Sequence, residues 1–414
     1  MVSKMKVAVV GLGIEGTHAL HSLLDFDHQV YASDLNEDLN IPMDNYDGGF
    51  EIELGRHNWD KINSADAVVV SPSLWKRDVL KKITSPNKIF SRVLGNHRDI
   101  FTIGVTGTNG KTTTALMIKD ILTNSGFKVL VGGNAGGGFD GYTRLMLEAS
   151  QDEYDYLIVE VCDMTLDFSR HNFHFDLVVV TNLGWDHINV HHSMEQYQER
   201  IYDFIKDKTV VLNKNDDLLS SLKNKSFLKG KPNFFDTYNG KLNLIGKYNR
   251  MNAGAAFTVS KILNIPEDKI CESLSSFKPV DGRITELKLG DSRIIIGKTD
   301  NVSAVTAVFQ ETKFDLAILG TPRREEYWRF DIFIELANFN PPYIVLFPGL
   351  DDTTSQAKEI LEKNSYKGKI RVSEDIFEIV DFISTNHGKY RTIFIGGNGQ
   401  DKITQIKRIL KGIS

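Results

Sequence analysis

Short, unbroken runs of apolar residues recur along the chain, and stretches with a helical pattern separate them. Two clear examples are Leu177–Val180, which reads Leu-Val-Val-Val, and Ala67–Val70, which reads Ala-Val-Val-Val. Such runs are typical of strands that are buried on both faces, as in a parallel sheet. Parallel neighbours need a long crossover connection, which a helix usually provides. The alternation therefore predicts an α/β fold.

The alternation falls into three consecutive parts, which we expect to be domains at residues 1–98, 99–284 and 285–414. The length of 414 residues fits three domains of roughly 150 residues each. Each is expected to be built on a mainly parallel sheet, as a Rossmann-like N-terminal domain, a P-loop central domain and a Rossmann-like C-terminal domain. The expected strands are Val7–Val10, Val30–Ser33, Ala67–Val70, Phe101–Val105, Val129–Val131, Tyr156–Val161, Leu177–Val180, Val210–Leu212, Arg293–Ile296, Leu316–Leu319, Tyr343–Leu346 and Thr392–Ile395.

The composition excludes several classes of function. With 49 basic and 54 acidic residues, the net charge is -5, which predicts no general nucleic-acid binding. The two cysteines, Cys162 and Cys271, cannot build a disulfide framework or a four-cysteine zinc site. No apolar run approaches the roughly 18 residues that a membrane-spanning helix requires. We therefore expect a cytoplasmic protein without a nucleic-acid or membrane partner.

The segment Thr106–Thr113 reads Thr-Gly-Thr-Asn-Gly-Lys-Thr-Thr, and it follows one expected strand and precedes a helical stretch. Glycines at this place let backbone N–H groups approach phosphate oxygens, and the helix N-terminus favours the negative charge. Lys111 can reach the β- and γ-phosphates, and the Thr112 hydroxyl can bind Mg²⁺. The strict G-x-x-x-x-G-K-[ST] pattern fails only at Val105, where its first glycine belongs. An ordinary glycine turn is the alternative.

A second glycine pattern, Gly11-x-Gly13-x-x-Gly16, lies between the first expected strand and a helical stretch. Asp34 ends the next strand, where an acidic residue that binds a ribose is expected. The pattern indicates a nucleotide diphosphate at the helix N-terminus, either in a redox cofactor or in a nucleotide-linked substrate. Tight packing of the strand on the helix is the structural alternative. A nicotinamide-dependent oxidoreductase would leave the phosphate loop at Lys111 unexplained.

Polar residues follow two expected strands of the central part: Glu160 ends one strand, and Asn182, Asp186 and His187 follow another. The carboxyl ends of parallel strands line the ligand crevice of an open sheet, so a carboxylate and an imidazole there could bind Mg²⁺. A zinc site is less favoured, because the histidines of this part match no standard ligand spacing. They are His171, His174, His187, His191 and His192.

Together these motifs resemble the Mur ligase family, the ATP-dependent amino-acid-adding enzymes of cell-wall precursor synthesis. The segments that carry the resemblance are Thr106–Thr112, Thr181–His187, Gly246–Ala253 and Asp281–Arg283. The first domain and the Gly133-Asn134-Ala135-Gly136 segment are similar to the L-alanine-adding and D-glutamate-adding branches. Gly397–Asp401 is similar to a segment of the third-residue-adding branch. This mixture is most like the archaeal pseudomurein peptide ligases.

The resemblance implies a role for each matching residue. The catalytic residues would be Lys111, His187 and Asn134, and the Mg²⁺ ligands would be Thr112, Glu160 and His187. The UDP-linked precursor would be bound by Gly11, Gly13, Gly16, Asp34 and Ser71. The incoming amino acid would be bound by Arg323, Asn398 and Asp401. ATP would be bound by Gly107, Thr108, Asn109, Gly110, Lys111, Thr112, Thr113, Asn249, Asn252, Arg283, Lys298 and Asp300.

The implied activity is ATP-dependent ligation of a free amino acid to a UDP-linked sugar or peptide precursor, through an acyl phosphate, by a monomer. The product would enter pseudomurein or peptidoglycan synthesis. One alternative is a Mur-like subunit that acts with a glutaminase partner or binds nucleotide without catalysis. Another is a folylpolyglutamate or cyanophycin-type ligase. The UDP-type first domain argues against both.

Overall fold

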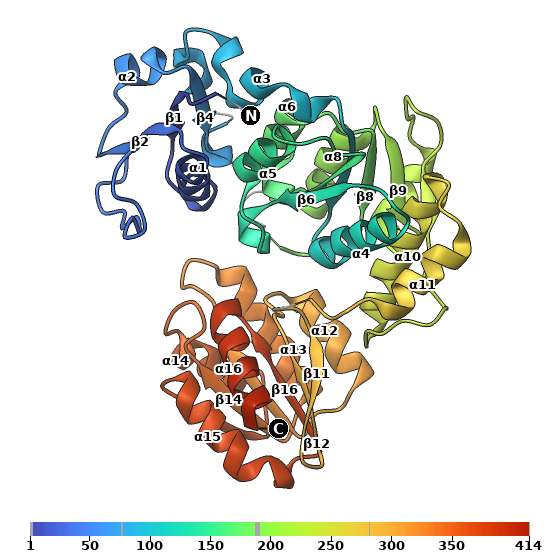
Figure 1. Cartoon of the computed structure of the whole chain (residues 1–414). Helices are drawn as coiled ribbons and strands as arrows, with labels where there is room; N and C mark the ends of the chain where they lie inside the picture. The colour runs from blue at the N-terminus through green and yellow to red at the C-terminus, as the bar shows by residue number, and fades with distance from the viewer. Residues whose placement is uncertain (1–2, 76–77, 187–190, 281, 414) are drawn as a thin grey trace. The chain divides into compact units, whose positions relative to one another are not determined.

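The computed structural model describes residues 3–75, 78–186, 191–280 and 282–413. The strands form three separate sheets, one of four strands and two of six. The chain forms two compact units, the first made of residues 1–183, 195–238 and 252–273 and the second of residues 184–194, 239–251 and 274–414. The first unit contains two of the sheets and the second unit contains the third (Figure 1). The expected α/β fold with three mainly parallel sheets is confirmed.

The first sheet is wholly parallel and has the strand order β3-β2-β1-β4. The chain moves outward from β1 to β3 and then returns to the other side of β1 as β4. The loops that follow β1 and β4 therefore adjoin at the carboxyl edge, where an open sheet binds ligands. The elements are β1 (Lys6–Val10), α1 (Ile14–Asp25), β2 (Gln29–Asp34), β3 (Phe50–Leu54), α2 (Trp59–Ser64), β4 (Ala67–Val70) and α3 (Phe90–Leu94).

The second sheet is also parallel, with the order β10-β9-β8-β5-β7-β6. The strand order reverses at the central strand β5, so the loops after β5, β7 and β8 meet at one edge. Helices α4 and α5 pack against β6 (Figure 1). The elements are β5 (Phe101–Thr106), α4 (Lys111–Asn124), β6 (Val129–Gly133), α5 (Tyr142–Ala149), β7 (Tyr156–Glu160), α6 (Leu166–Asn172), β8 (Leu177–Val180), α8 (Met194–Ile205), β9 (Thr209–Asn213), α9 (Asp217–Ser221), β10 (Asn233–Phe235), α10 (Lys247–Ile262) and α11 (Glu267–Ser276).

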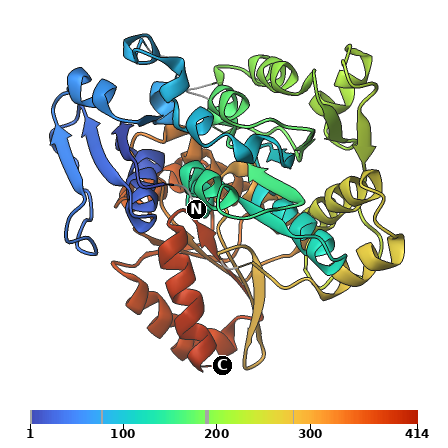
Figure 2. The same cartoon turned by 45° about the horizontal axis from the view of Figure 1, so that its top comes forward.

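The third sheet has the order β11-β12-β16-β13-β14-β15, and only its β11–β12 pair is antiparallel among the described strands. Alternate strand residues point to opposite faces, so β13 places Ala317 and Leu319 in one core and Leu316 and Ile318 in the other. Helices α12, α13 and α14 cover the first face. Helices α15 and α16, side by side and red in Figure 2, cover the second. The elements are β11 (Thr285–Leu289), β12 (Ser292–Ile296), α12 (Val302–Glu311), β13 (Leu316–Gly320), α13 (Asp331–Phe339), β14 (Tyr343–Phe347), α14 (Thr354–Lys363), β15 (Lys369–Val372), α15 (Ile376–Asn386), β16 (Thr392–Gly397) and α16 (Gln400–Ile413).

No helix of the described ranges is long and apolar enough to cross a membrane.

Candidate functional site

The phosphate loop connects the end of β5 to the start of α4, as the sequence predicts. Gly107 and Gly110 have φ angles of +123° and +83°, and a Cβ at Gly107 would lie 2.3 Å from Thr181 Oγ1. Both positions therefore need glycine. The Lys111 ammonium folds back over the loop and donates to the carbonyl oxygens of Gly107 at 2.8 Å and Thr108 at 2.9 Å. The positive charge thus lies at the N-terminus of α4, where phosphate oxygens bind.

The loop after β8 fixes the conformation of the phosphate loop. The Asn182 side chain accepts from Asn109 N at 3.0 Å and donates to Asn109 O at 2.9 Å. The backbone carbonyl oxygen of Asn182 accepts from Thr108 N at 2.9 Å, and Thr181 Oγ1 donates to Asn109 O at 2.7 Å. Asn182 and Thr181 therefore fix the backbone of the phosphate loop at Thr108 and Asn109.

Glu160, at the end of β7, joins the two glycine-rich loops of the second sheet. Its carboxylate is 1% exposed and accepts from Thr112 Oγ1 at 2.6 Å and from Asn134 Nδ2 at 3.1 Å. Thr112 lies in the first turn of α4, and Asn134 follows β6. Three residues that the sequence assigned to catalysis or metal binding are therefore in contact, since parallel strands bring their carboxyl ends together.

The oxygen donors of Thr112 and Glu160 fit Mg²⁺, which prefers hard oxygen ligands and completes its shell with waters and substrate phosphates. Among the described residues, no cluster of three or more histidines, cysteines and carboxylates could hold a metal ion. His187, the third predicted ligand, lies outside the described residues. The structure thus places two of the three predicted metal-site residues together.

The glycine turn after β1 has the tight geometry that the sequence predicts. A Cβ at Gly16 would lie 1.8 Å from the Gly11 carbonyl oxygen, whereas a Cβ at Gly13 would meet nothing within 4 Å. Asp34 Oδ2 accepts from Leu12 N at 2.6 Å, so this carboxylate stabilises the turn itself. Ser71, which directly follows β4, lies against the same turn. A Cβ added at Gly11 would lie 2.9 Å from the Cβ of Ser71. The residues predicted to bind the precursor therefore lie together, and Gly13 is exposed.

Glu15, which the sequence analysis did not single out, extends from α1 to the loops of the second sheet. Its Oε1 accepts from Ala135 N at 2.7 Å, and its Oε2 accepts from Tyr142 N at 3.3 Å. The only sequence signal is the position of an acidic residue inside a glycine pattern that would bind phosphate.

The remaining residues that the sequence predicts to bind ATP lie on several elements. Asn252, on α10, approaches the phosphate loop, since a Cβ at Gly110 would lie 2.2 Å from its Oδ1. Asn249, on the same helix, is buried and donates from Nδ2 to Ile245 O at 2.7 Å. Thr113 is buried in the first turn of α4. Arg283 is partly buried and donates from its backbone N to Val280 O at 3.1 Å.

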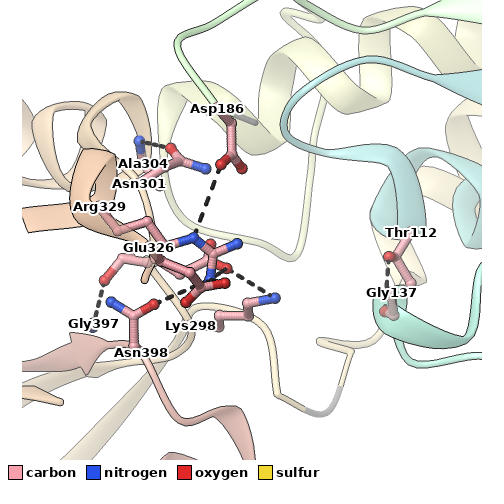
Figure 3. Close-up of polar contacts among 12 residues, drawn as sticks. Thr112, Gly137, Asp186, Lys298, Asn301, Ala304, Glu326, Arg329, Gly397 and Asn398 are labelled. Atoms are coloured by element: carbon pink, nitrogen blue, oxygen red, sulfur yellow. Dashed lines mark hydrogen bonds and ion pairs between the residues drawn. The ribbon is translucent and has the colours of Figure 1, made fainter. Parts of the chain in front are cut away.

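A charged cluster occupies the carboxyl edge of the third sheet in the second unit (Figure 3). The Lys298 ammonium lies 3.0 Å from Asp300 Oδ2, and Arg329 Nη1 lies 3.4 Å from the same oxygen. Burial alone would raise the pKa of Asp300, but these two cations outweigh it and hold that pKa well below its usual range. Arg329 also lies 3.5 Å from Glu326 Oε1 and 3.9 Å from Asp186 Oδ1. The predicted ATP-binding pair is therefore part of a larger network.

The residues predicted to bind the amino acid divide into one buried and two exposed side chains. Asn398 is fully buried; its Oδ1 accepts from Arg329 Nη1 at 3.2 Å, and its Nδ2 has no hydrogen-bond partner among the described residues. Arg323 is 46% exposed and lies 3.9 Å from Glu326. Asp401 is exposed on the first turn of α16. Arg329 and Glu326 were missed because the segment Glu325–Arg329 matches no motif.

Fold and site together define a three-sheet α/β protein with a P-loop for nucleotide phosphates and a Rossmann-like first domain. Comparison with known proteins shows what the chain is similar to. Residues 105–234 match the family model of the Mur ligase middle domain. UDP-N-acetylmuramoylalanine--D-glutamate ligase from Lachnospira eligens is 27% identical, over 92% of this chain and 90% of its own length.

Two solved structures share the fold over nearly the whole chain. A pseudomurein peptide ligase type C from Methanothermus fervidus has a TM-score of 0.61 and 22% identity, and 99% of each chain is covered. MurF ligase from Thermotoga maritima, in complex with ADP, has a TM-score of 0.64 and 18% identity, with 100% of this chain and 95% of that chain covered. Residues 105–234 are therefore similar to a Mur ligase middle domain, and the predicted resemblance to the Mur ligase family is confirmed.

Proposed function

We propose that the chain is an ATP-dependent, ADP-forming ligase that adds an amino acid to a UDP-linked cell-wall peptide precursor. The observation that carries this proposal is the contact of Thr112, Glu160 and Asn134 beside Lys111. This arrangement places a phosphate-binding loop, a carboxylate and an amide at one sheet edge. The names of the curated D-glutamate ligase relatives support the same activity.

The chemistry requires activation, because a carboxylate and an amine do not condense in water. A carboxylate oxygen of the precursor attacks the γ-phosphorus of ATP, and ADP leaves with the bridging oxygen. The amine of the amino acid then attacks the acyl carbon, loses a proton, and phosphate leaves. The Lys111 ammonium and the N-terminus of α4 stabilise the negative charge during the transfer. Asn134 orients the precursor, and Mg²⁺, when bound at Thr112, Glu160 and His187, would neutralise phosphate charge.

The other roles follow the division into domains 1–98, 99–284 and 285–414. Gly11, Gly13, Gly16, Asp34 and Ser71 bind the UDP-linked precursor, and the central domain binds ATP. Asn398, Arg323 and Asp401 bind the incoming amino acid. A cytoplasmic monomer in peptidoglycan or pseudomurein synthesis is the setting that these roles fit.

The test is phosphate release from Mg-ATP with UDP-linked sugar and peptide precursors, each combined with a panel of amino acids. We expect release only when one precursor and one amino acid are both present, with a product heavier by one residue in mass spectrometry. Absence of release in every combination, from a protein that binds ATP, would contradict the proposal.

A further inference from the structure

The loop between β6 and α5 carries Asn134 and is rich in glycine. Four of the seven residues 135–141 are glycines, and an isolated β-bridge between Gly133 and Gly141 closes the neck of the loop. Glycine loses more conformational freedom on folding than any other residue. A loop of this composition therefore needs contacts from other elements to keep one shape.

The start of this loop lies against the Glu160 carboxylate. Asn134 Nδ2 donates to Glu160 Oε1 at 3.1 Å, and the backbone N of Asn134 donates to Glu160 O at 3.1 Å. A Cβ added at Gly137 would lie 2.0 Å from Glu160 Oε1, and Thr112 Oγ1 lies 3.4 Å from Gly137 O (Figure 3). The loop is folded tightly around Glu160, so a small displacement of the loop would move the Asn134 amide away from this carboxylate.

Glu15 on α1 is bonded to both ends of the same loop. Its Oε1 accepts from Ala135 N at 2.7 Å, and Ala135 directly follows Asn134. Its Oε2 accepts from Tyr142 N at 3.3 Å, where the loop enters α5. A Cβ added at Gly141 would lie 3.1 Å from Oε2, so the loop backbone lies directly on the carboxylate. One side chain thus fixes the two ends of the loop relative to each other.

The helix that carries Glu15 is well anchored. Helix α1 packs against α5, and Arg144 Nη1 of α5 lies 2.8 Å from Asp25 Oδ2 of α1. Glu15 itself lies in the first turn of α1, where Gly16 packs closely on the carbonyl oxygen of Gly11. A side chain on such a turn can restrain a glycine-rich loop whose own backbone is soft.

The bonds to the loop need an acceptor atom at position 15 but not a full negative charge. Burial raises the pKa of Glu15 to about 7, and the negative charge of Glu160 raises it further, although the two backbone bonds lower it. A glutamine has the same length and one acceptor oxygen, whereas an aspartate is charged and shorter by one methylene group. These two substitutions therefore separate reach from charge.

We propose that Glu15 is a positioning residue of the ligase reaction, which holds the loop 134–141 so that the Asn134 amide stays bonded to Glu160. Its importance for turnover rests on the proposed function, which assigns Asn134 to the orientation of the precursor. Glu15 acts through Asn134 and touches none of the reacting atoms. A displacement of about 1 Å at a group that orients a substrate can cost about a hundredfold in rate, so a restraint at this distance has a measurable effect.

The first experiment measures kcat of phosphate release by the full chain with saturating Mg-ATP, UDP-linked precursor and amino acid. The variants are Glu15→Ala, Asn134→Ala and the protein that carries both changes. We expect Glu15→Ala to lower kcat about a hundredfold. The doubly changed protein should be no slower than Asn134→Ala, because Glu15 acts through Asn134. Losses that multiply in the doubly changed protein would overturn the inference, since a general weakening of the fold would act independently of Asn134.

A second set of variants tests reach against charge. We expect Glu15→Gln to keep kcat within about fivefold of the unchanged chain, because it retains one hydrogen bond to the loop. Glu15→Asp should lose as much as Glu15→Ala. Asp25→Ala is the matched control, since it removes the ion pair between α1 and α5 without touching the loop, and it should keep kcat. Equal losses in Glu15→Gln and Glu15→Asp, or in Asp25→Ala and Glu15→Ala, would overturn the inference.

Amide hydrogen exchange tests the restraint without ligase activity. In peptides that cover residues 134–142, we expect exchange to be faster by about tenfold in Glu15→Ala, because two N–H groups lose their acceptor, and unchanged in Asp25→Ala. If no combination of substrates releases phosphate, the proposed function fails, and faster exchange would still support the hold of Glu15 on the loop. If release is present but Glu15→Ala turns over like the unchanged chain, the inference fails and the proposed function stands.

Discussion

Lys111 provides the sharpest single-residue test of the phosphate loop. We expect Lys111→Ala to reduce phosphate release at least about a hundredfold, because the ammonium is aimed at the place where phosphate charge develops. The fold should survive, since the described hydrogen bonds of the Lys111 ammonium are to two carbonyl oxygens of its own loop. Phosphate release and the thermal denaturation midpoint, measured on the same preparation, check both statements.

Lys119→Ala is the matched control, because Lys119 lies on the same helix α4 and away from the loop. It should retain turnover close to that of the unchanged chain. Undiminished turnover in Lys111→Ala, or an equal loss in both variants, would contradict the role given to Lys111.

Replacement of Arg329 is predicted to lower the stability of the fold by an amount that depends on pH. Among the residues that the structure describes, Arg329→Met leaves Lys298 as the remaining cation beside Asp300. We therefore expect a loss of about 3 kcal/mol in the free energy of unfolding at pH 7. The folded-state pKa of Asp300 is lowered, so its stabilisation is present above the unfolded pKa of about 4 and is lost as the pH falls. The destabilisation should therefore shrink toward pH 3.

Urea denaturation at pH 7 and at pH 3 measures this difference. Arg324→Met, at an exposed arginine of the same loop, should have little effect at either pH. A destabilisation by Arg329→Met that is equally large at both values would show that packing, and not the charge of Asp300, is responsible.

At this scale the sequence predicts residues that belong to motifs and misses those that act through tertiary contact. Lys111, Thr112 and Glu160 were found because each follows an expected strand at a known spacing. Glu15 could not be found, because its partner Ala135 lies 120 residues away in the chain. Arg329 could not be found either, because its segment matches no motif and its partner Asn398 lies 69 residues away. A contact of this kind depends on the fold and leaves no local pattern.

Among the elements, the turn between β1 and α1 depends on one glycine. We expect Gly16→Ala to lower the free energy of unfolding by about 1–3 kcal/mol, because its Cβ would lie 1.8 Å from a backbone oxygen of Gly11 and the strand and helix would have to move apart. Gly13→Ala is the control, with open space around the new methyl group. Gly13 is the N-cap residue of α1, and we expect Gly13→Ala to lower the free energy of unfolding by less than about 1 kcal/mol. Equal losses in urea denaturation would contradict this explanation.

The sequence predicted every central strand of the three sheets but only two of their six edge strands, β4 and β6. Every expected strand coincides with a strand of the structure, since central strands are buried on both faces and are continuously apolar. The missed strands are β3, β10, β11 and β15, each of which ends a sheet. Edge strands are half exposed, and Lys369–Val372 reads Lys-Ile-Arg-Val, so their apolar signal is weak.

For the whole molecule, we predict a monomer in light scattering across the concentration range used for assays. The exposed large hydrophobic residues of the described ranges are spread along the chain from Ile14 to Ile413, and no two of them are adjacent in sequence. Single exposed apolar residues are ordinary on monomer surfaces and do not indicate an interface. A concentration-dependent rise in mass would contradict this prediction.

The hydrogen bonds that run from Thr112 through Glu160 and Asn134 to the loop that holds Glu15 have a thermodynamic consequence. A ligand at the phosphate loop that moves the Glu160 carboxylate would change the hydrogen bond that Asn134 donates to it. Asn134 directly precedes Ala135, whose backbone N–H donates to Glu15. If ADP binds at the phosphate loop and a UDP-linked precursor binds at the first domain, as we propose, the two are then linked ligands. If one ligand changes the affinity for the second by some factor, the second changes the affinity for the first by the same factor. This follows because the free chain, the two singly bound forms and the doubly bound form make a closed thermodynamic cycle.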